Sequence, residues 1–211
     1  DEPLRVARAV SSLKLDYAVI TGVTRDDLFD KAAGHYAATI KAIKDLAEKE
    51  EREVKVEVLT PDFDGQRDLI KKVVDAKPDV FGHNIETVSR IYNEIGREEY
   101  RYHVSFSLLE TVKSLNKDAV IKSSLLLGLG ETEDELKEIF EEFGDIGLDI
   151  LCLGQYLAPS TEHYPVQEYI TPEKFEEYKE LALSYGIKKV LAGPYVRSSY
   201  KARELGETVK S

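Results

Sequence analysis

The chain has 211 residues, of which 42% are hydrophobic and 33% charged, as in an ordinary globular protein with enough residues for a full core. Its formal net charge of −11 argues against a nucleic-acid partner, because such binding needs Lys and Arg to neutralise phosphates. No stretch approaches the ~20 consecutive apolar residues that span a bilayer, so no membrane association is expected.

Short β-branched runs alternate with longer amphipathic stretches, which is typical of βα units and a parallel sheet. The short runs are almost continuously apolar, as in strands that are buried on both faces. They predict strands at residues 17–21, 54–59, 80–83, 120–127, 150–155 and 188–191. Helical patterns fill the gaps at residues 3–13, 34–51, 66–76, 88–95, 105–115, 133–143 and 172–185.

Local signals mark several helix ends. Thr132 and Glu135 have the spacing of a capping box, Thr171 stands as an N-cap before Pro172, and Gly186 indicates a helix stop. No linker or low-complexity stretch interrupts the alternation of predicted strands and helices, so we expect a single domain over residues 1–211. Polar motifs follow successive strands, which favours a barrel or partial barrel whose site gathers at the carboxyl ends of the strands.

The first polar motif follows the strand at residues 17–21. Thr21, Arg25, Asp26 and Asp27 offer a hydroxyl, a guanidinium and two carboxylates, which suit the ammonium and carboxylate of an amino acid. An ordinary helix-capping loop explains the same residues equally well.

The second motif, His83-Asn84-Ile85-Glu86-Thr87, ends the third predicted strand. Its hydrogen-bonding side chains could grip a ribose or fix a ligand carboxylate. A polar strand-to-helix turn, in which Thr87 caps the following helix, explains the same residues comparably well. A metal site of His83, Asp62 and Glu86, as in barrel hydrolases, is disfavoured because no second histidine lies at a ligand-like spacing.

The third and fourth motifs end the next two strands. Because side chains alternate along a strand, Lys122 and Ser124 lie on the same strand face and could reach a cavity. Gly128 and Gly130 allow the backbone to approach a ligand closely. Gln155 and Tyr156 offer an amide and a phenol for an adenine edge or a carrier contact.

The sequence offers little for cysteine-based chemistry. Cys152 is the single cysteine, and we expect it to be a small buried hydrophobe without a catalytic role. One cysteine excludes a disulfide framework and indicates a reducing compartment, the cytoplasm or, in a eukaryote, the mitochondrial matrix. The sequence has no methionine and starts at Asp1, so we expect a trimmed, processed or engineered chain.

The motifs together resemble lipoyl synthases, which are radical S-adenosylmethionine (SAM) enzymes. The strings are ITGVTRDDL (20–28), HNIET (83–87), KSSLLLGLGET (122–132), LGQYLAPS (153–160) and AGPYVRSSY (192–200). The resemblance implies an α/β fold, a partial (β/α) barrel of the radical SAM type. It also implies a sulfurtransferase of lipoate biosynthesis, which uses SAM and two 4Fe-4S clusters to insert sulfur at C6 and C8 of a protein-bound octanoyl-lysyl group.

The resemblance also assigns roles to residues. Residues Asn84 and Glu86 would face SAM, and the strand and glycine turn of residues 122–131 would pack against its adenine and ribose. In the RSSY string, Ser199 or alternatively Ser198 would ligate an iron of the auxiliary cluster. Arg197 would contact the carrier or that cluster. The implied partner is an octanoylated lipoyl carrier domain or the glycine-cleavage H protein.

The chain departs from the family pattern in three respects. Gly22 replaces a serine, and Asp30-Lys31-Ala32-Ala33 stands where the family has D-G-G-A. The cluster motifs C-x4-C-x5-C and C-x3-C-x2-C are absent, as is the first barrel strand, so we expect an unpaired sheet edge and no activity of this chain alone. The alternatives are a non-catalytic or redesigned relative that binds at most SAM or a carrier, and an unrelated metal- or phosphate-using barrel enzyme.

The net charge of −11 raises a question about the carrier, because carrier domains are often acidic. A basic patch at the strand ends would resolve it. The candidates for that patch are Arg90, Arg97, Arg101 and Arg197.

Overall fold

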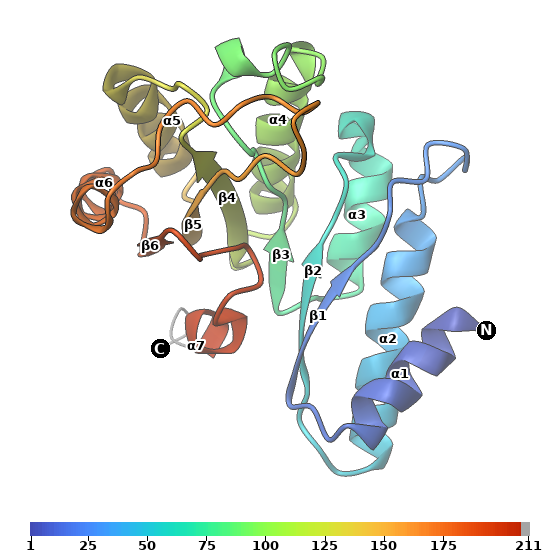
Figure 1. Ribbon diagram of the computed structural model, residues 1–211. Helices are drawn as coiled ribbons and strands as arrows, with labels where there is room; N and C mark the ends of the chain where they lie inside the picture. Colours follow the sequence, from blue (N-terminus) through green and yellow to red (C-terminus); the bar gives the residue numbers. More distant parts are fainter. Residues whose placement is uncertain (208–211) are drawn as a thin grey trace.

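Six parallel strands lie side by side in chain order, β1-β2-β3-β4-β5-β6, in a sheet that does not close (Figure 1). The computed structural model describes residues 1–207. The strands are β1 Tyr17–Thr21, β2 Lys55–Leu59, β3 Val80–Gly82, β4 Ile121–Leu127, β5 Ile150–Gln155 and β6 Lys189–Gly193. The helices are α1 Glu2–Ser12, α2 Ala33–Lys49, α3 Arg67–Asp75, α4 Tyr100–Leu115, α5 Glu133–Asp145, α6 Pro172–Ser184 and α7 Ala202–Glu207, with short 3₁₀ turns η1 Phe63–Gly65 and η2 Ser89–Ile91.

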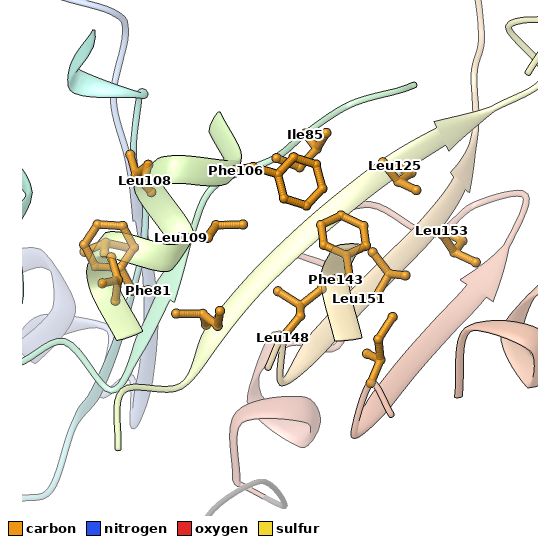
Figure 2. Packing of buried hydrophobic residues seen from close by; sticks show 14 of the residues in the cluster. Phe81, Ile85, Phe106, Leu108, Leu109, Leu125, Phe143, Leu148, Leu151 and Leu153 are labelled. Carbon is orange, nitrogen blue, oxygen red and sulfur yellow. The ribbon is translucent and has the colours of Figure 1, made fainter. Parts of the chain in front are cut away.

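The outer face of the sheet carries the main core. Phe81, Leu125 and Leu151 point to this face and pack with apolar side chains of α4 and α5 (Figure 2). Phe106 of α4 and Phe143 of α5 lie 5.1 Å apart between their ring centroids, so the two helices share one aromatic contact above the sheet. The alternation of side chains along each strand leaves the other residues for the opposite, inner face.

The C-terminal segment covers the inner face. Leu205 of α7 packs against the small cluster of Val80, Val120 and Ile150, which is separate from the main core. In Figure 1 α7 lies in front of the sheet, while α2 to α6 lie behind and around it. Within residues 1–207, none of the helices is long and apolar enough to cross a bilayer.

The predicted partial barrel and all six predicted strands are confirmed. The capping box of Thr132 and Glu135 is present, and Thr171 caps α6. The helix predicted at residues 88–95 is wrong, because only the short turn η2 forms there and the fully buried Tyr92 turns its hydroxyl back to the Ile85 carbonyl. α4 begins five residues before the predicted start, and the short helix α7 was not predicted.

A buried ion pair crosses the inner face. Lys122 Nζ lies 2.8 Å from Glu57 Oε1, and both side chains are at most 3% exposed. Tyr17 Oη donates a 2.6 Å hydrogen bond to the other Glu57 oxygen. Lys122 and Ser124 do share a face, as predicted, but the Lys122 amine is directed to β2 and is held there.

We expect Lys122→Met to lower the free energy of unfolding by about 3–5 kcal/mol, because it leaves the Glu57 carboxylate buried without its cation. Adding Glu57→Gln removes that charge while keeping an acceptor for Tyr17, so the double variant should recover most of the loss. Urea unfolding measures both. Lys71→Met, at an exposed pair with Asp75 on α3, is the matched control and should change stability by under about 0.5 kcal/mol. A Lys122→Met loss as small as that of the control would contradict the prediction.

Candidate functional site

A cavity of about 380 Å³ lies at the carboxyl ends of β1, β2 and β3. Four of the residues predicted from separate strand ends line it, namely Thr21, Asp26, Asn84 and Glu86. They meet because parallel strands bring their carboxyl ends to one edge. Arg25 lies outside this cavity and pairs with Asp27 at 2.7 Å, and the hydrogen bond between them raises the pKa of Arg25 and lowers that of Asp27.

A second hollow of about 530 Å³ continues along the same edge towards β5. It shares Glu86 and Arg97 with the first cavity, so the two are neighbours. Leu126, Leu129 and the predicted Tyr156 give it a more apolar wall. Together the hollows offer one polar compartment and one compartment with a more apolar wall, which Glu94, Glu162 and His163 also border, each within the roughly 300–1,000 Å³ of small-molecule sites.

Glu86 stands between the two hollows on a constrained backbone. Its φ of +74° lies in the left-handed region, which non-glycine residues seldom adopt. The conformation is held because its N–H donates to the Ser124 carbonyl at 3.0 Å and its carbonyl accepts from Leu126 N at 2.7 Å. The carboxylate lies 3.6 Å from the Arg97 guanidinium. Strain of this kind concentrates at ligand sites.

His83 is built into the wall as a neutral side chain. Nδ1 is 2.8 Å from the Thr60 carbonyl, which can only accept, so Nδ1 carries the hydrogen. Nε2 then accepts from Ser105 Oγ at 2.9 Å. Burial lowers the pKa of His83.

The metal interpretation of this wall has no support in its geometry. Both His83 nitrogens are occupied, and Asp62 is paired with Arg101 at 2.7 Å. Among residues 1–207, no three His, Cys, Asp or Glu side chains form a group that could hold a metal ion.

The Gly128-x-Gly130 turn is held by side chains. Gly128 has a φ of +94°, and an added Cβ would lie 2.2 Å from the Glu168 carbonyl oxygen. The Glu131 carboxylate accepts from the N–H groups of Gly128 and Leu129 at 2.6 and 2.9 Å, and burial raises its pKa. Gly130 has a φ of +98° and lies against Gln167, so both glycines are needed by the turn itself.

The predicted ligand amide of Gln155 is committed to the backbone. Its nitrogen donates to the carbonyls of Leu127, Tyr156 and Glu168, and its oxygen accepts from Ile170 N at 2.9 Å. These bonds fasten the 156–170 loop to β4 and β5. Only the second lone pair of the oxygen is left for a ligand, and the side chain is buried at 3% exposure.

The RSSY segment lies apart from the two hollows. It crosses the inner face at Gly154, where an added Cβ would lie 2.2 Å from the Val196 carbonyl oxygen. Ser198 is partly exposed and Ser199 exposed, and neither lines either hollow. Arg197 is exposed and donates to the Val196 carbonyl at 2.6 Å.

The arginines do not form a free basic patch at this edge. Arg90 binds Glu135 at 2.7 Å, and this pair lowers the pKa of Glu135 to about 2. Arg97 and Arg101 are likewise paired, with Glu86 and Asp62. Among the described residues, Arg197 has bonds to backbone carbonyls and no carboxylate partner.

Cys152 is fully buried on β5, where its register partners are Ser124 and Leu191. Burial raises the pKa of its thiol to about 11, so a thiolate is disfavoured there. The described residues therefore do not provide the ligands of a 4Fe-4S cluster.

A further hollow, of about 760 Å³, lies at the opposite edge, where the strands begin. Asp79 and Asp149 there accept from the N–H groups of Val56 and Ile121 at 2.9 Å, and lysines neutralise them. These contacts secure strand starts. The chemistry of a barrel gathers at the other edge, so the hollows beside Glu86 are the candidate site.

Comparisons with known proteins show the family of this chain. The Radical SAM superfamily model matches residues 1–143. The lipoyl synthase of Caldicellulosiruptor saccharolyticus is 49% identical over 204 residues, which span 97% of this chain and 70% of that protein. The lipoyl synthase of Alkaliphilus metalliredigens is 48% identical, with 97% and 69% covered. The chain belongs to the lipoyl synthase family.

Solved structures support the fold of this family member. HydG, a maturase of the [FeFe]-hydrogenase, superposes with a TM-score of 0.66 at 12% identity, over 90% of this chain and 48% of that one. HydG from Carboxydothermus hydrogenoformans gives 0.60 at 14% identity, over 97% and 57%. At such identities the likeness concerns the fold alone.

Sequence reasoning missed several residues of the candidate site in this lipoyl synthase family member. Thr60 and Ser105 fix His83, and Lys31 and Asp64 lie behind the polar compartment. Arg97 was considered only for a basic patch, yet it borders both hollows. No spacing signal connects these residues, because they lie on separate loops and helices.

The free energy of unfolding of this protein should fall as the pH drops below about 6.5, the ordinary pKa of histidine. The reason is that His83 is neutral in the folded protein and protonates more readily in the unfolded chain. The stabilisation is complete above that pH. The loss should approach roughly 1.4 kcal/mol per pH unit below it. His83→Gln keeps a donor and an acceptor and should show a flatter curve in urea unfolding at several pH values. His163→Gln, in an exposed loop, is the control, and parallel curves for wild type and His83→Gln would refute this.

Gly154→Ala should displace the RSSY segment, because the new methyl group meets the Val196 carbonyl. We expect a cost of about 1–3 kcal/mol and faster amide hydrogen exchange over residues 194–207. Gly147→Ala, where no heavy atom lies within 4 Å of an added Cβ, should cost about 0.5–1 kcal/mol through its left-handed φ of +69° without affecting that segment. Unchanged exchange in Gly154→Ala would show that the crossing at Gly154 does not hold the segment.

Proposed function

We propose that this chain is the SAM-binding barrel of a lipoyl synthase that inserts sulfur at C6 and C8 of a protein-bound octanoyl-lysyl group. The observation that carries the proposal is the convergence of Thr21, Asp26, Asn84 and Glu86 on one cavity in a chain 49% identical to a lipoyl synthase. Under this proposal residues 1–211 form one domain with a C-terminal RSSY segment.

The two hollows suit the two ends of SAM. The carboxylates of Asp26 and Glu86 and the hydroxyl of Thr21 would bind the ammonium of the methionyl end, with Asn84 beside them. The apolar wall of Leu126, Leu129 and Tyr156 would take the adenine. Lys122, Ser124 and Gln155 support the strands and loop behind these hollows, and Gly128 and Gly130 shape the turn beside them.

In this family SAM supplies a 5′-deoxyadenosyl radical when it is bound at a reduced cluster. The share of this chain is to bind and orient SAM and to exclude water. The cluster ligands do not come from its described residues, so we propose that the chain alone does not turn over. Ser199, or alternatively Ser198, is proposed as an iron ligand only where the other ligands are supplied.

The proposed partner is an octanoylated lipoyl carrier domain or the glycine-cleavage H protein. Arg197 supports this assignment, because its guanidinium is exposed and bonds backbone carbonyls, whereas Arg90, Arg97 and Arg101 are each paired with a carboxylate. An exposed cation is suited to an acidic carrier surface.

A second candidate is a non-catalytic or redesigned relative that retains SAM or carrier binding. Two observations together favour it: the one cysteine is buried on β5, and the cavity at the ends of β1 to β3 is formed without it. The two candidates are separated by anaerobic cluster reconstitution with the cluster ligands supplied in addition to this chain. Iron and sulfide per chain and the formation of 5′-deoxyadenosine are then measured, and 5′-deoxyadenosine formation favours the lipoyl synthase. Stoichiometric iron on this chain alone would contradict the proposal that its own residues cannot hold a cluster.

Glu86→Gln should weaken SAM binding at least about tenfold, because a hydrogen bond to a charged group is worth roughly 1.5–3 kcal/mol. Isothermal titration of the chain with SAM measures this. Glu180→Gln, an exposed residue of α6 far from the site in sequence, is the matched control and should bind like the wild type. Equal affinity of Glu86→Gln and wild type would remove Glu86 from the proposed site.

A further inference from the structure

Two loops beside the polar compartment carry an uncommon backbone. Lys31 and Ala32, just before α2, have φ values of +46° and +66°. Phe63 and Asp64, in η1 after β2, have φ values of +51° and +49°. Consecutive left-handed residues other than glycine are rare, because the Cβ approaches the following carbonyl oxygen.

Local contacts hold each of these turns. Asp30 accepts from the N–H groups of Ala32 and Gly34 at 3.2 and 3.0 Å, which fixes the start of α2. Phe63 is fully buried and packs edge-to-face on Tyr36, with 6.2 Å between the ring centroids. The two turns are thus determined by their surroundings and direct the side chains of Lys31 and Asp64 towards each other.

Lys31 joins the two loops. Its Nζ lies 2.7 Å from Asp64 Oδ2 on the loop after β2 and 3.1 Å from Asp26 Oδ1 on its own loop. The side chain is only 13% exposed, although both of its partners are largely open to water. Its bonds to Asp64 and then Asp26 raise the pKa of Lys31, so the amine is a cation at neutral pH.

The chain of charges continues around the compartment. Asp64 Oδ1 lies 3.3 Å from Arg101, and Arg101 lies 2.7 Å from Asp62. Asp26, Asp62 and Arg101 line the cavity, whereas Lys31 and Asp64 do not. The two residues outside the cavity therefore connect three that form its wall.

We propose that Lys31 is a positioning residue of this site, which holds Asp26 and the wall formed by residues 21–27 against the loop after β2 without touching the ligand itself. The inference deepens the proposed function, on which its choice of SAM as ligand rests. It requires ligand affinity to depend on the charge at position 31 and on the ionic strength.

The test uses Lys31→Gln and the conservative Lys31→Arg in the full chain. Without ligand, Lys31→Gln should raise amide hydrogen exchange over residues 22–30 and 62–66 by roughly 2- to 5-fold, the range expected from one or two partly exposed ion pairs. Titration with SAM should show a loss of affinity of similar size at about 0.1 M salt. The ratio to wild type should shrink at about 1 M salt, where the Debye length falls from about 10 Å to about 3 Å.

Controls separate the charge from the backbone. Lys31→Arg should restore both readouts, and Lys71→Gln, at the exposed pair on α3, should change neither. Ala32→Gly relaxes a left-handed residue while keeping the amine and should leave affinity unchanged. The double variant Lys31→Gln/Asp64→Asn should lose less than the sum of the two single losses, because the Lys31–Asp64 contact is counted in both single variants, whereas Lys31–Asp26 and Asp64–Arg101 are each lost once.

The possible failures are distinct. Unchanged exchange in Lys31→Gln would overturn the bridge itself. Faster exchange with wild-type SAM affinity would overturn the positioning role and leave the proposed function standing. A wild-type chain that binds no SAM would overturn the proposed function, and the positioning role with it, whatever the exchange shows.

Discussion

The parallel direction of all six strands is the constraint on which the rest of the structure depends. Since each strand returns through a helix, every carboxyl end lies along one edge and every amino end along the other. The two edges then differ in composition. At the amino edge, Asp79 and Asp149 are used by strand N–H groups and lysines, while at the carboxyl edge Asp26, Asn84 and Glu86 face a cavity.

The packing of the inner face is consistent with a candidate site at that edge. Lys122 and Glu57 neutralise each other below the cavity, and Cys152 is packed on β5 with a thiol that resists ionisation. The segment after β6 then crosses at Gly154 and ends in α7 against Val80 and Ile150. Among the residues that the structure describes, the interior of the open barrel is thus packed below the candidate cavity.

Most of the fold follows from local patterns in the sequence, and part of the site does too. Apolar runs located the strands, and Thr132 with Glu135 located a helix start, because burial and capping act within a few residues. Thr21, Asn84 and Glu86 could be grouped because parallel strands share an edge. Lys122 shows the limit of this reasoning, since alternation gives the face of a side chain but not the partner two strands away. At residues 88–95 the expected helix is replaced by the turn η2, and the buried Tyr92 hydroxyl bonds the Ile85 carbonyl, a tertiary contact that an apolar pattern does not predict.

The left-handed residues show where the fold departs from local preference. Lys14, Glu51 and Lys77 each follow the end of a helix, where a left-handed residue closes the last turn and has an ordinary structural reason. Glu86, Lys31 with Ala32, and Phe63 with Asp64 follow no helix end and lie in the loops beside the candidate site, whereas Lys201, with a φ of +49°, directly precedes α7 and lies away from it. Each costs conformational energy that tertiary contacts must offset, here the bonds to Ser124 and Leu126, the cap by Asp30 and the packing on Tyr36. Most of the left-handed residues that no helix end explains thus lie at one edge, as expected of a preorganised binding site. The same edge therefore carries the charges, the cavity and the strained backbone.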